Sequence, residues 1–260
     1  MYQMVFTTIG KLIKLKRLKV NDISASCTMN IEILNNSLGR VSQIEDLEVH
    51  FTHKNAGKPS TTAIKFHKYL KKLRRLKLVN VWHRDFTESL FDMASQRHLT
   101  ELDLQFVPDV PLPNFCEALQ IFRKLQRLTL NSLNFNKINE SMFIEFLKNA
   151  PNLQALCLDS VEVSNQFANI LKAFRHSETL SELRLANIPI QNSAYRLEKL
   201  QDFIVNAYKM HKCSLEVNKL ANVDFLSLMY LNRSLLELEL IDQRFGKEKP
   251  PKPAAGSTAA

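Results

Sequence analysis

One short pattern of apolar residues recurs along most of the chain and restricts the possible folds more than any other feature. An apolar residue is followed by two variable residues, a second apolar residue, one variable residue and a third apolar residue. The pattern occurs nine times, for example as LQRLTL from Leu125, with one degraded copy, MHKCSL from Met210. The middle apolar residues recur every 25 to 30 positions: Leu18, Leu47, Leu76, Leu102, Leu128, Leu156, Leu183, Cys213 and Leu238. Chance does not hold a six-residue pattern to such spacing, so the chain consists of structural repeats.

Most repeats also contain a segment with helical periodicity after the short apolar pattern. Asn114 and Ser164 are placed to cap two of these helices, and Pro151 ends a third just before the next pattern. A longer helix is expected between Asn187 and Tyr208. The residues expected on buried helix faces are Phe86, Leu90, Met93, Phe115, Ala118, Leu119, Phe122, Phe143, Phe146, Leu147, Phe167, Ile170, Leu171, Phe174, Leu197, Leu200, Ile204 and Ala207. One strand and one helix cannot bury their apolar sides alone, so neighbouring repeats must stack.

These repeats resemble those of leucine-rich repeat proteins over residues 1–245, in about nine repeats. Stacked strands lie about 4.8 Å apart, whereas helices are about 10 Å across, so the array must curve. We therefore expect an α/β leucine-rich repeat solenoid, a horseshoe with parallel strands on the concave face and helices on the convex face. Residues 246–260 are rich in Pro, Ala and Lys and are expected to form a flexible tail.

Two stretches, Leu128–Asn165 and Leu183–Ile190, resemble the repeats of F-box/leucine-rich-repeat proteins within the ribonuclease-inhibitor-like class, with Ala150 where that family has cysteine. No F-box is visible. The resemblance implies a non-catalytic protein-interaction module that captures substrates for ubiquitin transfer. An alternative is a structural subunit of a larger assembly, because the N-terminal segment of Tyr2, Met4, Val5, Phe6, Ile9, Leu12 and Ile13 is apolar. An upstream domain or partner is expected to cover that edge.

The basic residues are concentrated in one window. The net charge is +9, and eight Lys and Arg residues between Lys65 and Arg84, with no acid among them, account for all but one unit of it. Arg75 and Lys77 belong to an expected strand; the other six define the basic patch, which consists of Lys65, Lys68, Lys71, Lys72, Arg74 and Arg84. This patch is either a solvated helix face or an accessory site for an acidic peptide, a phosphate or a nucleic acid.

Charges expected on the concave face alternate in sign from repeat to repeat. The residue before the middle leucine is Arg17, Asp46, Arg75, Glu101 and Arg127 in the first five repeats. The residue after it is Lys19, Glu48, Lys77 and Asp103 in the first four. Stacking brings opposite charges side by side, whereas a groove that follows phosphates needs one sign along its length. Nucleic-acid binding across this face is therefore not expected.

The expected partner-binding residues lie on this face and at the ends of neighbouring strands. Three aromatic residues follow consecutive strands and, with polar neighbours, are expected to form a cluster beside the basic patch, the kind of cluster in which interface energy concentrates. The alternative is that Phe51 and Trp82 turn inward and seal the loops. The complete predicted set is Arg17, His50, Phe51, Arg75, Lys77, Trp82, Glu101, Gln105, Phe106 and Arg127.

Signals for chemistry are weak. His50 and His53 have no further ligands at suitable spacing for zinc, and no catalytic or phosphate-binding motif occurs. We therefore expect no enzyme activity, cofactor or metal. Cys27, Cys116, Cys157 and Cys213 are widely spaced, so we expect reduced thiols. No apolar run is long enough to span a membrane and no secretory leader is visible, which predicts an intracellular protein, cytoplasmic or nuclear.

Overall fold

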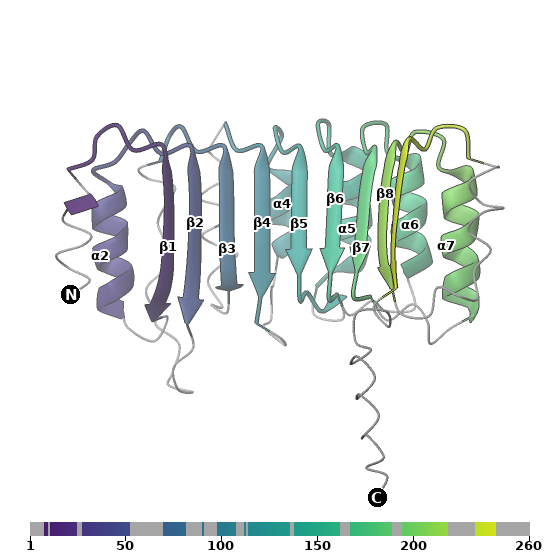
Figure 1. The fold of residues 1–260 in the computed structure, drawn as a ribbon, viewed down its shortest axis with the longest axis horizontal. Coiled ribbons are helices and arrows are strands. Elements are labelled where there is room, and N and C mark those ends of the chain that lie inside the picture. The colour runs from purple at the N-terminus through teal and green to yellow at the C-terminus, as the bar shows by residue number, and fades with distance from the viewer. Residues whose placement is uncertain are drawn as a thin grey trace, which may run out of the picture.

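The computed structural model describes residues 8–9, 11–24, 28–52, 70–81, 90, 98–107, 112, 114–135, 138–161, 167–188, 194–217 and 232–242. In this part of the chain nine strands form one parallel sheet, in which spatial order equals sequence order (Figure 1). The strands are β1 (Arg17–Ser24), β2 (Asp46–Thr52), β3 (Arg75–Val81), β4 (Glu101–Phe106), β5 (Arg127–Asn131), β6 (Ala155–Asp159), β7 (Glu182–Ala186), β8 (Lys212–Val217) and β9 (Glu237–Asp242). Each strand coincides with one copy of the sequence pattern.

The helices lie on one side of this sheet and leave the other side open (Figure 1). Their bounds are α2 (Thr28–Leu38), α4 (Phe115–Gln120), α5 (Glu140–Asn149), α6 (Phe167–His176) and α7 (Ala194–Asn206). This arrangement confirms the predicted α/β leucine-rich repeat solenoid. No helix in the described ranges is long and apolar enough to cross a membrane.

The middle residues of the nine patterns lie in register across the sheet. Leu18 pairs with Leu47, and the same alignment continues without a shift to Cys213 and Leu238. Leu47, Leu76 and Leu128 are fully buried between sheet and helices. Every strand thus contributes the same layer of the core, because each repeat offers the same alternation of inward and outward side chains.

The predicted helix faces form the other half of the core. Phe115, Phe143, Phe174 and Leu200 are all buried, and aromatic rings pack edge to face between neighbouring repeats, as Phe174 does with Phe203 at 5.4 Å. Residues 82–89, 91–97 and 162–166, which include Phe86, Met93 and Ser164, lie outside the described residues, as do residues 1–7 and 243–260, so the predicted tail is not tested.

One predicted helix cap is wrong. Asn114 precedes α4 with a φ of 58°, in the left-handed region, and its side chain makes no capping hydrogen bond. Asn139, which the sequence pattern did not single out, is a true cap: its side chain accepts a hydrogen bond from the backbone N–H of Met142 at 3.2 Å. The two residues have the same type but opposite backbone conformations, and only the extended one points its amide at the helix.

The strands end in two different ways. In β3, β5, β6 and β7 a buried aliphatic residue follows a polar residue with positive φ; these pairs are Asn80–Val81, Ser132–Leu133, Ser160–Val161 and Asn187–Ile188. The positive φ interrupts the alternation and turns the next side chain inward. In β2 and β4 the alternation instead continues one step further, so Phe51 and Phe106 are buried.

Candidate protein-interaction face

The open face of the sheet carries two long rows of outward side chains, one on each side of the middle residues. The row before them is Arg17, Asp46, Arg75, Glu101, Arg127, Ala155, Glu182, Lys212 and Glu237. The row after them is Lys19, Glu48, Lys77, Asp103, Thr129, Cys157, Arg184, Ser214 and Glu239. We call this surface the open face.

The predicted charge alternation is confirmed over the first four strands. Lys77 Nζ lies 3.3 Å from Asp103 and 4.0 Å from Glu48, and Arg75 lies 3.6 Å from both Asp46 and Glu101. Each such exposed pair contributes only about 0–1 kcal/mol. Together they leave no stripe of one sign, which argues against phosphate tracking along this face.

Glu48 is the most heavily contacted carboxylate of the open face. It accepts hydrogen bonds from Lys19 Nζ at 3.0 Å and from the ring of His50 at 2.5 Å. Burial opposes its ionisation, but the hydrogen bonds from His50 and Lys19 and the charges of Lys19 and Lys77 outweigh burial and lower the pKa of Glu48 below its ordinary value of 4.5. Glu48 therefore ties the first three strands together as an anion.

An ion pair spans three strands in the middle of the sheet. Arg127 on β5 reaches Glu182 on β7 at 2.9 Å, although β6 lies between them. The intervening residue of the row is Ala155, whose small side chain is buried with 4% of its surface exposed. A larger side chain on β6 would separate the two charges, so the alanine allows this contact.

The open face is hollowed beside this pair. A depression of about 600 Å³ is lined by residues from β3 to β9. Its lining residues come from seven neighbouring strands, so the depression extends across most of the open face. On its floor Thr129 and Cys157 make no side-chain hydrogen bond to any described residue, and burial raises the pKa of the Cys157 thiol to about 11. A neutral floor is therefore bordered by charged pairs.

A polar network closes the strand ends next to the depression. Asp159 accepts hydrogen bonds from Asn131 at 3.1 Å, Asn187 at 2.8 Å and Ser160 at 2.9 Å. These donors come from β5, from the end of β7 and from the turn after β6. Asn131 and Asp159 are register partners, and Ser160 and Asn187 are equivalent residues with positive φ after their strands. The network was missed because the repeat pattern follows apolar residues and does not show which polar residues form hydrogen bonds between repeats.

The predicted partner-binding residues fall into three groups: residues on the open face, buried residues, and one residue outside the described ranges. Arg17, Arg75, Lys77, Glu101 and Arg127 lie on the open face, and His50 and Gln105 continue it two positions further along their strands. Phe51 and Phe106 are buried, with 2% and 3% of their surfaces exposed, so neither is available to a partner in this structure. For Phe51 this matches the alternative in which its side chain turns inward. Trp82 lies outside the described residues.

Half of the basic patch can be located. Lys72 donates a hydrogen bond to Gln43 at 2.6 Å. Arg74 lies close enough to Glu45 to help lower the pKa of that carboxyl, after the larger effects of the hydrogen bond and charge of Lys16. Lys71 is exposed. The remaining members, Lys65, Lys68 and Arg84, lie outside the described residues.

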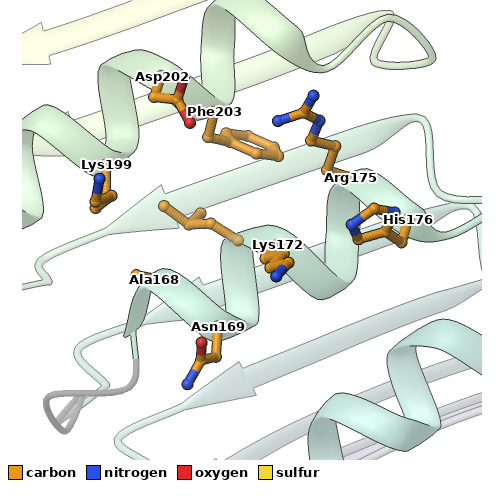
Figure 2. Close-up of a pocket in the computed structure, with 9 residues that line it drawn as sticks. Ala168, Asn169, Lys172, Arg175, His176, Lys199, Asp202 and Phe203 are labelled. Atoms are coloured by element: carbon orange, nitrogen blue, oxygen red, sulfur yellow. The ribbon is translucent and has the colours of Figure 1, made fainter.

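A second depression, of about 310 Å³, lies on the helix side between α6 and α7 (Figure 2). Lys172, Arg175 and His176 come from α6, and Lys199 and Asp202 from α7. Its basic character was missed because the sequence prediction considered only the apolar faces of these helices. It lies on the side opposite the open face. The described residues contain no group of three or more side chains able to hold a metal ion.

Comparison with known proteins adds little. No family model and no curated protein matches the chain. An internalin from Listeria monocytogenes is similar over 93% of this chain and 74% of its own, with 12% identity and a TM-score of 0.42. The tropomodulin C-terminal domain of Caenorhabditis elegans is similar over 85% of each chain, with 9% identity and a TM-score of 0.28. Superposition at this level carries no functional information, and the solenoid assignment rests on strand order and register.

Proposed function

We propose that this chain is a non-catalytic protein-interaction module that binds another protein on its open face. The observation that carries this proposal is the depression with the neutral floor of Thr129 and Cys157 inside a border of ion pairs. Protein interfaces have the same organisation: charged residues are depleted at the centre and enriched in a polar rim.

The border also indicates the chemistry of the partner. Arg127 and Glu182 present opposite charges within 2.9 Å of each other, as do Lys77 and Asp103 within 3.3 Å. A partner of mixed charge can match such pairs, whereas a polyanion meets a carboxylate beside every cation. The partner is therefore expected to be a folded protein or peptide with both charges and an apolar centre that enters the depression.

A charge swap in the middle of the open face tests this function. The double variant R127E/E182R keeps one cation and one anion on β5 and β7 but reverses the field that a partner meets. The substitution at Arg127 puts a carboxylate beside Glu101, and the substitution at Glu182 puts a guanidinium beside Lys212. We therefore expect the swap to lower the free energy of unfolding by about 1–2 kcal/mol and to weaken binding at least about tenfold, since like charges across an interface cost several kcal/mol. Affinity purification followed by titration of the captured partner measures the loss of binding, and urea unfolding measures the change in stability.

The matched control places charge changes away from the open face. Lys124 and Lys148 are exposed and make no ion pair to any residue of the described ranges, so K124E/K148E should retain the partner. A partner that binds R127E/E182R and the unmodified chain equally would exclude the middle of the open face as the binding surface.

The narrower function, a substrate-recognition part of an F-box-type ubiquitin ligase, is supported by the likeness of Leu128–Asn165 to that family. Co-precipitation of a ubiquitin-ligase scaffold with the chain tests it, and the intracellular location follows only if it holds. Accessory nucleic-acid or phosphate binding by the basic patch requires affinity that falls steeply as salt rises.

A further inference from the structure

Large apolar side chains are exposed mainly at the two ends of the sheet. Six are exposed in the described part of the chain, and four of them flank the terminal strands: Leu12 at 47%, Ile13 at 67%, Leu236 at 84% and Leu240 at 38%. The middle leucines Leu18 of β1 and Leu238 of β9 are only partly buried, in contrast to the fully buried interior ones. Each end thus presents the apolar layer that a further repeat would cover.

Both terminal strands also have a free backbone edge within the described residues. β1 pairs only with β2, and β9 pairs only with β8. An edge strand carries a row of unsatisfied N–H and C=O groups that can pair with another strand. Both ends therefore offer unpaired backbone groups and exposed apolar side chains to another strand. The charged side chains beside them determine which strand can pair there.

The two edges carry opposite charges at equivalent positions. On β1 the outward residues beside the middle leucine are Arg17 and Lys19, and on β9 they are Glu237 and Glu239; all four are exposed. The chain already pairs such residues internally: Lys212 lies 2.6 Å from Glu237 and Lys19 lies 3.0 Å from Glu48.

We propose that this chain binds a second copy of itself head to tail, with β1 of one copy adding to β9 of the other as a further parallel strand. In the register that all eight internal interfaces share, Leu18 meets Leu238, Arg17 meets Glu237 and Lys19 meets Glu239. Pairing of β1 with β1, or of β9 with β9, places like charges opposite each other and is disfavoured.

The geometry of this contact predicts an open series of oligomers. A head-to-tail contact uses different surfaces on its two partners and leaves one free end on each side. The contact uses Arg17, Lys19, Glu237 and Glu239 at the two edges of the open face. Of these only Glu239 lines the depression, so the middle of the open face stays free for the proposed partner. Sedimentation velocity over about a hundredfold range of concentration should show species growing beyond the dimer.

Charge reversal at each end provides the decisive test. The variant R17E/K19E has two acidic ends, and E237K/E239K has two basic ends. Each alone should stay monomeric, with association weakened at least about tenfold. An equal mixture of the two should assemble again, because every acidic β1 edge then finds a basic β9 edge. The control K124E/K148E alters the net charge as much as R17E/K19E does and should assemble like the unmodified chain.

The mixing experiment also separates lost association from lost folding. Both variants create like-charged neighbours within the chain. The substitution at Arg17 puts a carboxylate beside Asp46, and the substitution at Glu237 puts an ammonium group beside Lys212. Far-UV circular dichroism and thermal midpoints are therefore recorded for each variant. Folded variants that remain monomeric when mixed would overturn the proposal. So would an unmodified chain that stays monomeric at every concentration, or variants that associate undiminished.

Discussion

Individual charged residues on the open face contribute little to the free energy of folding, but they influence which strands can lie next to each other. Arg75 lies between Asp46 and Glu101, and Lys77 lies between Glu48 and Asp103. Each exposed pair is worth about 0–1 kcal/mol, small beside the burial of a leucine at about 1.5–3 kcal/mol. These ion pairs instead favour one order of the strands, because exchanging two neighbouring strands would bring like charges together.

Glu48 should make stability depend on pH. Its pKa is lowered in the folded chain, so its contribution is complete above the unfolded-state pKa and is lost as pH falls through the folded-state pKa. Urea unfolding from about pH 6 to about pH 3 should show a shallower loss of stability for E48Q than for the unmodified chain. E145Q, at an exposed carboxyl with no ion pair among the described residues, should retain the full loss. Equal acid slopes for E48Q and the unmodified chain would contradict the role of Glu48.

At the scale of single elements, the same residue type serves opposite purposes. Asn139 begins α5 with an extended backbone and caps it, while Asn114 precedes α4 in the left-handed region without capping it. Asparagine tolerates that region better than other residues with a side chain. Sequence patterns locate both helices because apolar spacing is local, but they do not distinguish these two asparagines.

The same substitution at the two asparagines should therefore change the free energy of unfolding differently. At Asn139, serine should be tolerated and alanine should cost about 0.5–2 kcal/mol, because only serine can still cap. At Asn114, glycine should be tolerated, whereas serine and alanine should each cost about 1–2 kcal/mol because of the positive φ. Urea unfolding of N139S, N139A, N114G, N114S and N114A measures the differences. Tolerance of serine together with loss of stability at alanine would show that Asn114 is a cap after all.

For the whole molecule, stability should be graded along the array. Interior strands such as β5 are covered on both sides, with Leu128 fully buried, while Leu18 and Leu238 of the terminal strands are partly exposed. In a solenoid each repeat is held only by its neighbours. The ends therefore lack half of the contacts that hold the middle.

Hydrogen exchange should reveal this gradient. We expect amides of β5 and β6 to exchange slowest and those of β1 and β9 fastest at low protein concentration, since local opening begins where fewest contacts are broken. If copies associate end to end, exchange in β1 and β9 should slow as concentration rises, while that in β5 stays constant. Uniform exchange over all nine strands would contradict a graded array.

The repeat spacing alone predicted the strand positions and their register. The residues at equivalent positions of the repeats then predicted the alternation of charge. These features follow from a local period of two in each strand and from the stacking of equivalent residues, so reading Leu18 to Leu238 in order was enough. The helix faces around Phe143 and Phe174 were likewise visible, because apolar spacing of three and four residues identifies a helix without knowledge of its neighbours.

Only the tertiary structure decided which strand-end residues face the core and where the open face is hollow. Phe51 and Phe106 are buried while Asn80 and Ser132 turn aside, a difference in the sign of φ that residue type does not fix. The contact of Arg127 with Glu182 skips a strand over Ala155. Such features depend on distances between strands that are not neighbours in sequence, and those distances exist only once the repeats have stacked.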